Sequence, residues 1–414
     1  MDQHPDEQAL RRFVRGELKS SDAHKIDHHL SICTECRDRA DEAAIPLILR
    51  LQDSWTSYDY DESFDRAAAR AADRLSLVFG EAWTTEVLLE ELLREPAPAR
   101  CRTVRNDERF HTLNLCDALQ ARAQELWLLD PAQSLILADL AIEVAQHLQT
   151  EKYGSALVED ARARSWAKLG NLFRVVTDLR RSEQALAQAW LHHLEAGQDS
   201  YTEIEILGYI ANLRKVQSRF SDAVHLCDRA LSLCREGEDH ILEADSLIRK
   251  GHILGREGQH KSAIFAIREG LNKLIPDENP WLVFHGTHNL AAVLSISGSP
   301  IEAERLLTKV LPVYQDNGRK TAAAWNFWLE GLVAKNLGDF PQAETALRKA
   351  QESFLNGLSS SDVVSVTLEL AEIYCRTGKP RQVKEALSEV IPLTEALGLH
   401  RQALMARLLY EQAV

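Results

Sequence analysis

The sequence predicts an all-α protein, in which a small zinc-stabilised helical module is followed by a tetratricopeptide-like α-solenoid. Two observations predict this fold: a 40-residue spacing of turn residues over most of the chain, and a group of histidines and cysteines in the first 36 residues. A fixed period of this length is typical of stacked helical hairpins. Nothing in the 414 residues reads as β structure.

The first element carries four side chains suited to a closed metal site. His29, Cys33 and Cys36 are spaced H-x3-C-x2-C, and His4 stands 25 residues upstream of His29. Neutral imidazoles and thiolates are the ligands that tetrahedral Zn²⁺ prefers, and four of them leave no open position for chemistry. Residues four apart on a helix share a face, so His29 and Cys33 can meet one ion if the chain between them keeps helical geometry.

Other interpretations of these residues stay open. His24 and His28 form an i, i+4 pair, and one of them could replace His4 as a ligand. The two cysteines could be an idle or a redox pair, although a redox C-x-x-C is expected beside a βαβ pattern. A core this small cannot offset its chain entropy alone, so we expect zinc to hold the module together.

The stretch from His4 to Arg37 resembles the zinc-binding domain of anti-sigma factors. It has the upstream ligand, a G-x-L near the end of the first helix at 16–18, and the terminal H-x3-C-x2-C. The resemblance covers about the first 50 residues and implies an extracytoplasmic-function sigma factor as partner. In that family the next helix inserts between the two conserved domains of the sigma factor. The matching stretch, about 37–55, carries the candidate sigma-binding residues Leu47, Ile48, Leu51 and Trp55. The same apolar face could instead pack on the protein's own repeats.

Composition argues against several kinds of partner. The formal net charge is −14, and an acidic protein repels the phosphate backbone of nucleic acids. The five cysteines after Cys36 have no disulfide-like spacing, and the N-terminus lacks a signal-peptide pattern, so a cytoplasmic location is expected. The uncharged stretch Asn279–Ile301 is in phase with the repeats, and we interpret it as a buried repeat helix and not a membrane span.

Three further segments are expected after the module at 1–55. Residues 56–114 should form a helical linker region, in which Pro96 and Pro98 end a pair of helices. Residues 115–398 should form seven repeats. Residues 399–414 should form an amphipathic capping helix, because the last repeat otherwise leaves an apolar face unpaired.

The repeats are defined by a turn residue with small residues on either side of it. The turn residues are Ser218, Gly258, Gly298, Gly338 and Gly378, and two earlier turns are placed at Gly170 and Leu129. Around the five later turns the side chain is small seven positions before and five after the turn, and a larger apolar residue stands nine after it; the unit at Leu129 is degenerate, with Arg122 at the small position. Small residues let two antiparallel helices approach closely. For the five turns from Ser218 to Gly378, the residues seven before are Ala211, Gly251, Ala291, Gly331 and Ala371, those five after are Ala223, Ala263, Ala303, Ala343 and Val383, and those nine after are Cys227, Ile267, Leu307, Leu347 and Leu387.

This pattern resembles the tetratricopeptide repeat, and Gly338–Ala343 and Arg219–Ala223 carry the resemblance best. That family has a period of 34, so a period of 40 implies longer helices or loops. Pro276, Pro280 and Pro392 fall at or near expected unit ends, where a helix should stop.

Solenoids bind ligands on the concave face, which the first helix of each unit forms. In the repeat family, the residues that face the groove stand at fixed distances before the turn glycine. The residues at the matching positions here are Arg164, Lys168, Asn212, Lys215, His252, Arg256, His285, His288, Trp325, Trp328, Lys335 and Asn336. These cations, amides and aromatics suit an acidic peptide or a free carboxylate with an apolar anchor. Asn212 and Lys215 alone approach the carboxylate clamp of that family. Alternatively, these residues form an ordinary exposed helix face that binds no ligand, and Trp325 belongs to the core.

No motif of nucleotide binding, zinc protease or serine hydrolase chemistry occurs, so we expect no enzymatic activity. His192 and His193 are expected to be a solvated pair. Two functions follow. The zinc module sequesters a sigma factor while the repeats sense a protein or peptide partner, or the chain is an interaction scaffold whose zinc module is purely structural.

Overall fold

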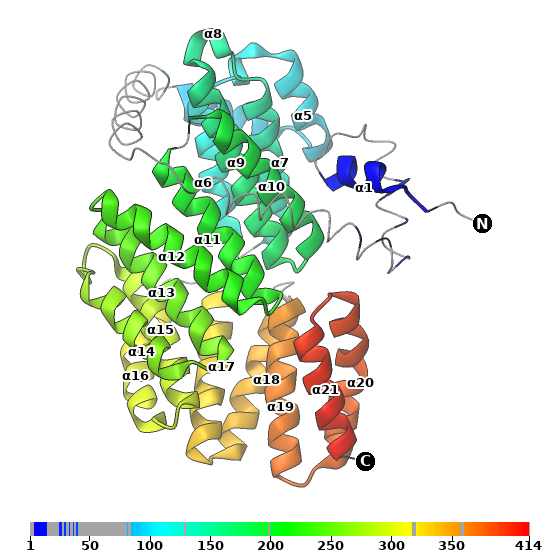
Figure 1. Ribbon diagram of the computed structural model, residues 1–414, viewed down its shortest axis with the longest axis vertical. Helices are drawn as coiled ribbons and strands as arrows, with labels where there is room; N and C mark the ends of the chain where they lie inside the picture. The colour runs from blue at the N-terminus through cyan, green and yellow to red at the C-terminus, as the bar shows by residue number, and fades with distance from the viewer. Residues whose placement is uncertain are drawn as a thin grey trace. The chain divides into compact units, whose positions relative to one another are not determined.

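The computed structural model describes residues 4–14, 25, 26, 29, 33, 36, 39, 81, 84–127, 130–197, 199–316, 320–356 and 360–413. Within these residues the regular structure is helical and no strand occurs, which confirms the all-α prediction (Figure 1). The chain divides into two compact units, one of Met1–Gln124, Gln133–Arg174 and Asp178–Tyr209, and one of Glu125–Ala132, Val175–Thr177 and Ile210–Val414.

The first unit holds the N-terminal helix and the earlier hairpins. A helix at 84–94 lies in the expected linker region, and residues 56–80 are outside the described residues. The other elements are α1 (Glu7–Val14), α5 (Ala97–Asn106), η2 (Glu108–Phe110), α6 (Leu113–Leu126), α7 (Pro131–Gln146), α8 (Thr150–Tyr153), α9 (Ser155–Val175), α10 (Leu179–Glu195) and the start of α11 (Ser200–Val216).

The second unit is a run of antiparallel helices of similar length. They are α12 (Phe220–Glu236), α13 (His240–Glu257), α14 (His260–Asn272), α15 (Pro280–Ile296), α16 (Pro300–Asp316), α17 (Lys320–Leu337), α18 (Phe340–Asn356), α19 (Ser360–Arg376), α20 (Pro380–Ala396) and α21 (His400–Gln412). Each packs on the next, and α13, α15, α17, α19 and α21 also pack on one another in turn. These odd-numbered helices therefore form a continuous layer, as expected for the concave layer of helical repeats.

The predicted turn residues of the second unit all adopt the left-handed conformation. Their φ angles are 60° at Ser218, 100° at Gly258, 93° at Gly298, 89° at Gly338 and 67° at Gly378. The residue after each turn donates its N–H to the carbonyl five residues earlier, at 2.8–2.9 Å. This bond closes the end of the first helix of each hairpin in a Schellman motif. The 40-residue spacing is therefore a spacing of helix ends.

The small positions before the turns are sites of close helix approach, as predicted. A Cβ added at Gly251 would lie 2.4 Å from Ile267 Cγ1, and one at Gly331 would lie 2.5 Å from Leu347 Cγ. Real Cβ atoms essentially never come so near another heavy atom. The larger apolar residue of the second helix thus fills the space that glycine leaves in the first.

Two details of the repeat assignment are wrong. Gly170 is not a turn residue, because it lies inside α9, where an added Cβ would meet Leu186 Cγ at 2.7 Å. The turn is Thr177, seven residues later, with φ of 64°. A β-branched residue is a rare occupant of this conformation, so the residue type at this position did not indicate a turn. Pro392 lies inside α20 and does not end it. The first predicted turn, Leu129, lies outside the described residues.

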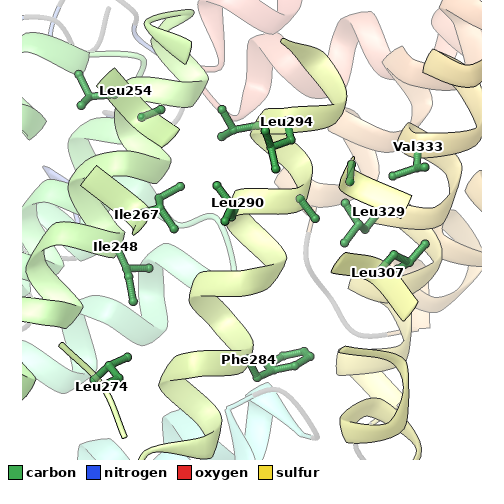
Figure 2. Packing of buried hydrophobic residues seen from close by; sticks show 14 of the residues in the cluster. Ile248, Leu254, Ile267, Leu274, Phe284, Leu290, Leu294, Leu307, Leu329 and Val333 are labelled. Atoms are coloured by element: carbon green, nitrogen blue, oxygen red, sulfur yellow. The ribbon is translucent and has the colours of Figure 1, made fainter. Parts of the chain in front are cut away.

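The uncharged stretch at 279–301 forms a buried helix, as predicted. In α15, Phe284, Leu290 and Leu294 are at most 6% exposed and share a hydrophobic cluster with neighbouring helices (Figure 2). The other labelled members of that cluster are Ile248, Leu254, Ile267, Leu274, Leu307, Leu329 and Val333. Among the described helices, none is long and apolar enough to span a bilayer.

The last helix, α21, has one buried and one apolar exposed side. Ala403 and Ala406 are buried in its contact with α19 and α20, at 9% and 0% exposure. Leu404, Met405 and Leu408 remain 45–59% exposed on the outside. The outer face is thus less polar than is expected of a helix that ends a repeat array.

Candidate functional site

The four predicted metal ligands come together at the N-terminus. The ligand atoms of His4, His29, Cys33 and Cys36 all lie within 4.8 Å of one another. His4 Nδ1 is 3.1 Å from Cys36 Sγ and 3.5 Å from Cys33 Sγ. Two tetrahedral ligands at Zn–N of about 2.1 Å and Zn–S of about 2.3 Å would be about 3.6 Å apart. The separations therefore fit a single metal ion held by two imidazoles and two sulfurs.

Local backbone structure explains this convergence. Cys33 N donates to His29 O at 2.9 Å, so these two residues have the helical relation on which their shared face depends. At the other end, Asp6 caps α1 by accepting from Ala9 N at 2.7 Å, which fixes the start of the helix just after His4. In α1, Leu10 is fully buried.

Burial and hydrogen bonding also fit a metal. Cys36 is fully buried, Cys33 and His29 are half-buried, and His4 is exposed. His29 Nε2 is buried without a hydrogen-bond partner among the described residues, a state that is costly unless something ligates the nitrogen. Both cysteines are free thiols and form no disulfide. These observations support a metal centre with one water-facing ligand.

Several N-terminal residues of interest fall outside the described residues. They are the alternative ligands His24 and His28, the G-x-L at 16–18, and the candidate sigma-binding residues Leu47, Ile48, Leu51 and Trp55.

The groove residues predicted in the first unit serve its own packing. Arg164 is 8% exposed, and its guanidinium lies 3.0 Å from carboxylates of both Asp160 and Asp117. Lys168 is half-buried on the same helix. Two acids of the same unit thus already hold the charge of Arg164.

In the second unit, the predicted cations and imidazoles gather on the odd-numbered helices. Lys215 Nζ on α11 lies 3.5 Å from His252 Nδ1 on α13, and His285 and His288 of α15 are electrostatic neighbours of His252. Asn212 is half-buried one turn before Lys215. The structure thus brings together groups that lie in three successive predicted repeats.

Enclosure by protein keeps these imidazoles neutral. Burial, reinforced by the charges of Lys215 and Arg256, holds the pKa of His252 well below its usual value. Burial also lowers the pKa of His285 to about 4, despite nearby Asp245, and that of His288 to about 3. A neutral imidazole has a free lone pair, so His252 Nδ1 can accept from the Lys215 ammonium.

Arg256 of α13 is an exposed cation with charged neighbours on two other helices. Its side chain is exposed to water, yet surrounding protein lowers the pKa of Arg256, an effect that Glu369 and Asp362 of α19 oppose. Arg401 of α21 donates to the backbone carbonyl of Arg256 at 3.1 Å. Arg256 is therefore an exposed residue of α13 that lies near groups of α19 and α21.

Two tryptophans of α17 flank this face. The ring centroids of Trp325 and Trp328 lie 6.3 and 6.4 Å from that of His288. The ring centroid of Phe284 lies 6.5 Å from that of His288. Trp328 Nε1 is buried without an acceptor among the described residues. Both tryptophans are half-buried, so they belong partly to the core and partly to the face.

Two predicted groove residues of α17 are engaged within the protein. Lys335 is 7% exposed and lies 2.5 Å from Glu369 and 2.7 Å from Glu372. Burial opposes its charge, but these carboxylates outweigh burial and raise the pKa of Lys335. Asn336 donates to Ser295 Oγ at 2.9 Å. Groups from neighbouring helices thus already bind both side chains.

His192 and His193 are not a solvated pair. His193 is 1% exposed, and its Nε2 lies 3.6 Å from a carboxylate oxygen of Glu203. His192 Nδ1 lies 2.6 Å from Glu159, which also binds Arg162 at 2.6 Å. Glu159, His192 and Glu195 are close enough together to share an ion, but Glu159 is already occupied by its two basic neighbours. The sequence showed only that these histidines are adjacent.

Comparison with known proteins identifies the fold. No protein-family model and no curated protein matches the chain. It is similar to the crystal structure of a Rap protein complexed with competence and sporulation factor, with a TM-score of 0.56 and 16% identity over 72% of this chain and 81% of that one. BtubC (BKLC) from P. vanneervenii matches at a TM-score of 0.32 and 14% identity, over 65% of this chain and 92% of that one, which carries no argument. The first similarity shows that this chain has an all-α helical-repeat fold.

Proposed function

We propose that this protein is a cytoplasmic, non-enzymatic transcription regulator. Its N-terminal module, held by Zn²⁺ on His4, His29, Cys33 and Cys36, sequesters an extracytoplasmic-function sigma factor, and its repeats sense a protein or peptide partner. The convergence of these four ligand atoms within 4.8 Å carries the proposal, because the sequence resemblance to anti-sigma factors depends on that ligand set.

The repeats contribute the sensing surface. The repeat-fold neighbour was crystallised with competence and sporulation factor, so a related fold accommodates a signalling partner. In the present chain, Lys215, His252 and Arg256 gather on the odd-numbered helices of the second unit, where a concave face would receive a partner. For such binding to regulate sigma release, the partner must bind free and sigma-bound protein with different affinities.

Co-purification tests the proposal. Tagged full-length protein isolated from its native host should bring down a sigma factor, and replacing both Leu47 and Leu51 by Asp should remove it, since an unpaired charge buried in an interface is costly. The matched control replaces the exposed Leu404 and Leu408 of α21 by Asp, which should leave sigma recovery unchanged. Capture of no sigma factor by the intact protein would contradict the proposal.

The second candidate is an interaction scaffold whose zinc module is purely structural. It is favoured by the extent of the helical-repeat fold, since the Rap-like similarity covers 72% of the chain. The same experiment separates the two, because a scaffold would bring down partners that are unaffected by the Leu47 and Leu51 substitutions.

A further inference from the structure

Within the second unit, the last helix contacts helices that come much earlier in the chain. Arg401, in the first turn of α21, donates from Nη1 to the backbone carbonyl of Arg256 at 3.1 Å, although 145 residues separate them. The Arg401 guanidinium also lies over the ring of Phe220, the first residue of α12, 5.2 Å from its centroid. Because α13, α15, α17, α19 and α21 pack on one another in turn, this contact joins the last helix of the row to the first.

A second contact of this kind is made by Thr177, which belongs to the same unit. Its Oγ1 accepts a hydrogen bond at 3.3 Å from the backbone N–H of Ser361, which lies in the first turn of α19 and 184 residues further along the chain. The first N–H groups of a helix have no acceptor within that helix. The threonine hydroxyl therefore caps α19 from a distant part of the sequence.

This hydrogen bond gives a reason for the unusual conformation of Thr177. Its φ is 64°, whereas the equivalent turn is glycine in four hairpins of the second unit. Glycine adopts the left-handed conformation without the cost that a β-branched side chain incurs. Glycine has no hydroxyl, however, and could not accept from the Ser361 N–H. Threonine at this position both forms the turn and caps α19.

The two contacts share one geometry. Arg256 lies in the last turn of α13 and Thr177 forms a helix-ending turn, whereas Ser361 and Arg401 lie in the first turns of later helices. Carbonyls of a last turn and N–H groups of a first turn are the groups that a helix leaves unpaired, so such ends complement each other. Enclosure and Arg401 lower the pKa of Arg256, but Glu369 and Asp362 of α19 oppose this effect. The charges of α19 thus also favour the approach.

We propose that the contacts of Arg401 and Thr177 form a clasp that holds the first turns of α19 and α21 against the earlier helix ends, and that releasing the clasp opens the row of odd-numbered helices. None of the five residues that form the clasp (Thr177, Phe220, Arg256, Ser361 and Arg401) belongs to the hydrophobic cluster around α15, so the core does not depend on them.

The consequence for regulation rests on the proposed sensing role of the repeats. A partner that binds the row of odd-numbered helices shifts the clasp only if its affinities for the open and closed forms differ. By linkage, a variant that opens the clasp must then change the affinity for that partner. The clasp itself is tested with the protein alone.

Hydrogen exchange of the Ser361 amide in the full-length protein tests the contact with Thr177. Thr177→Val keeps the shape and branching of threonine but removes the hydroxyl, so Ser361 should exchange about tenfold faster, the effect of one lost hydrogen bond. Thr177→Ser keeps the hydroxyl and should retain the protection. Thr177→Gly relieves the strain and should fold at least as well as the unsubstituted protein, yet it should also lose the protection.

A second substitution tests whether the two contacts act together. Arg401→Gln removes the guanidinium that reaches Arg256 and Phe220, and it leaves Thr177 and Ser361 in place. Exchange of the Ser361 amide should nevertheless accelerate by about twofold or more, because contacts that open together are coupled. The matched control is Arg381→Gln on α20, where the arginine side chain is 89% exposed and pairs with Glu385 of the same helix. It should leave Ser361 unchanged.

Small-angle X-ray scattering measures the opening. The double variant Thr177→Val with Arg401→Gln should have a larger radius of gyration than the unsubstituted protein and than Arg381→Gln. Circular dichroism should report the same helix content in all three, because opening moves helices without unfolding them.

Four outcomes would overturn the inference. Unchanged exchange of Ser361 in Thr177→Gly would remove the hydrogen bond, and unchanged exchange in folded Arg401→Gln would leave two independent contacts in place of a clasp. An unchanged radius of gyration in the double variant would contradict the opening, and a loss of helix content would show that the core depends on the clasp. None of these results bears on sigma recovery from the native host, so a failure here is distinguishable from a failure of the proposed function.

Discussion

At the scale of single residues, the protein depends on glycines that permit close helix contact. Gly331 of α17 faces Leu347 of α18, whose Cγ and Cδ2 would lie 2.5 and 2.7 Å from an added Cβ. Leu347 is fully buried, so it cannot swing away into water. The overlap involves mainly the leucine side chain, since the backbone nitrogen of Leu347 would be 3.3 Å from the added Cβ.

Gly331→Ala should therefore lower the free energy of unfolding by about 1–3 kcal/mol, even though alanine is the better helix former. Leu347→Ala should cost about 2–5 kcal/mol through its cavity. In the double variant the loss of stability should be about 1 kcal/mol smaller than the sum of the two single losses, because alanine at 347 makes room for the methyl group added at 331. Urea denaturation of all four proteins measures this coupling. Strict additivity would contradict the close contact.

A second residue-scale prediction concerns His288, which is 5% exposed between aromatic rings. Burial lowers the pKa of His288 to about 3, whereas an unfolded histidine titrates near 6.5. Above pH 6.5 both states are neutral and the group contributes nothing. Below pH 6.5 the unfolded chain binds a proton that the folded chain does not. The free energy of unfolding therefore decreases as the pH is lowered, by about 2 kcal/mol at pH 5 for this group.

Urea denaturation at pH 7.5 and pH 5 measures this effect. His288→Gln should show a smaller loss of stability on acidification than the unsubstituted protein, since one of the titrating groups is removed. The comparison of the two proteins cancels the contributions of other groups. His240→Gln, at a position where the histidine side chain is 73% exposed, should leave the pH dependence unchanged. An equal pH dependence in His288→Gln would show that His288 is protonated in the fold.

At the scale of elements, the hairpins share one way of ending the first helix. The left-handed turn residue is glycine in four hairpins of the second unit and serine at Ser218, where φ is 60°. A side chain in this conformation costs roughly 1–2 kcal/mol compared with glycine. The hydrogen bond from Arg219 N to Arg214 O, at 2.8 Å, shows that the motif forms despite this cost.

Ser218→Gly should consequently raise the free energy of unfolding, by about 1 kcal/mol or somewhat less, because glycine also increases the entropy of the unfolded chain. The reverse change at an equivalent turn, Gly378→Ala, should lower stability by a similar amount. Differential scanning calorimetry of the two variants provides the comparison, with Ser218→Ala as the control that should gain nothing. If Ser218→Gly has no higher Tm than Ser218→Ala, the turn is not strained.

At the scale of the whole molecule, the metal centre and the repeats depend on different stabilising forces. The candidate ligands all lie between residues 4 and 36, and none comes from the helices after residue 84. The repeats bury their own apolar residues, as the cluster around α15 shows. Metal binding contributes on the order of 10 kcal/mol to modules of this kind, which have little core of their own.

The purified full-length protein should therefore contain one zinc per chain, measured by mass spectrometry after preparation without chelators. Cys36→Ser should lose the metal and unfold the N-terminal module, and circular dichroism should still report a helical protein. The control Cys375→Ser, at a half-buried cysteine of α19, should retain the zinc. Zinc-free protein in both the unsubstituted form and the control would contradict the metal centre.

The sequence by itself determined the features that depend on local backbone geometry and on ligand chemistry. A left-handed helix end favours glycine whatever surrounds it, so the turns at Gly258, Gly298, Gly338 and Gly378 could be found from their spacing. Metal preference likewise depends on residue type, and the H-x3-C-x2-C spacing implies a shared face. The exception at Thr177 shows the limit, since there the fold imposes the conformation on a residue that does not favour it.

Only the tertiary structure decided which charged residues are available to a ligand. Lys335 is bound by acids that lie 34 and 37 residues later in the chain, and Arg164 is bound by one that lies 47 residues earlier. Lys215 has the same predicted role, but its ammonium lies 3.5 Å from the neutral imidazole of His252 on the next odd-numbered helix. The energy of a charge depends on its distance to other charges and on its hydration, and both are set by helices far away in the sequence.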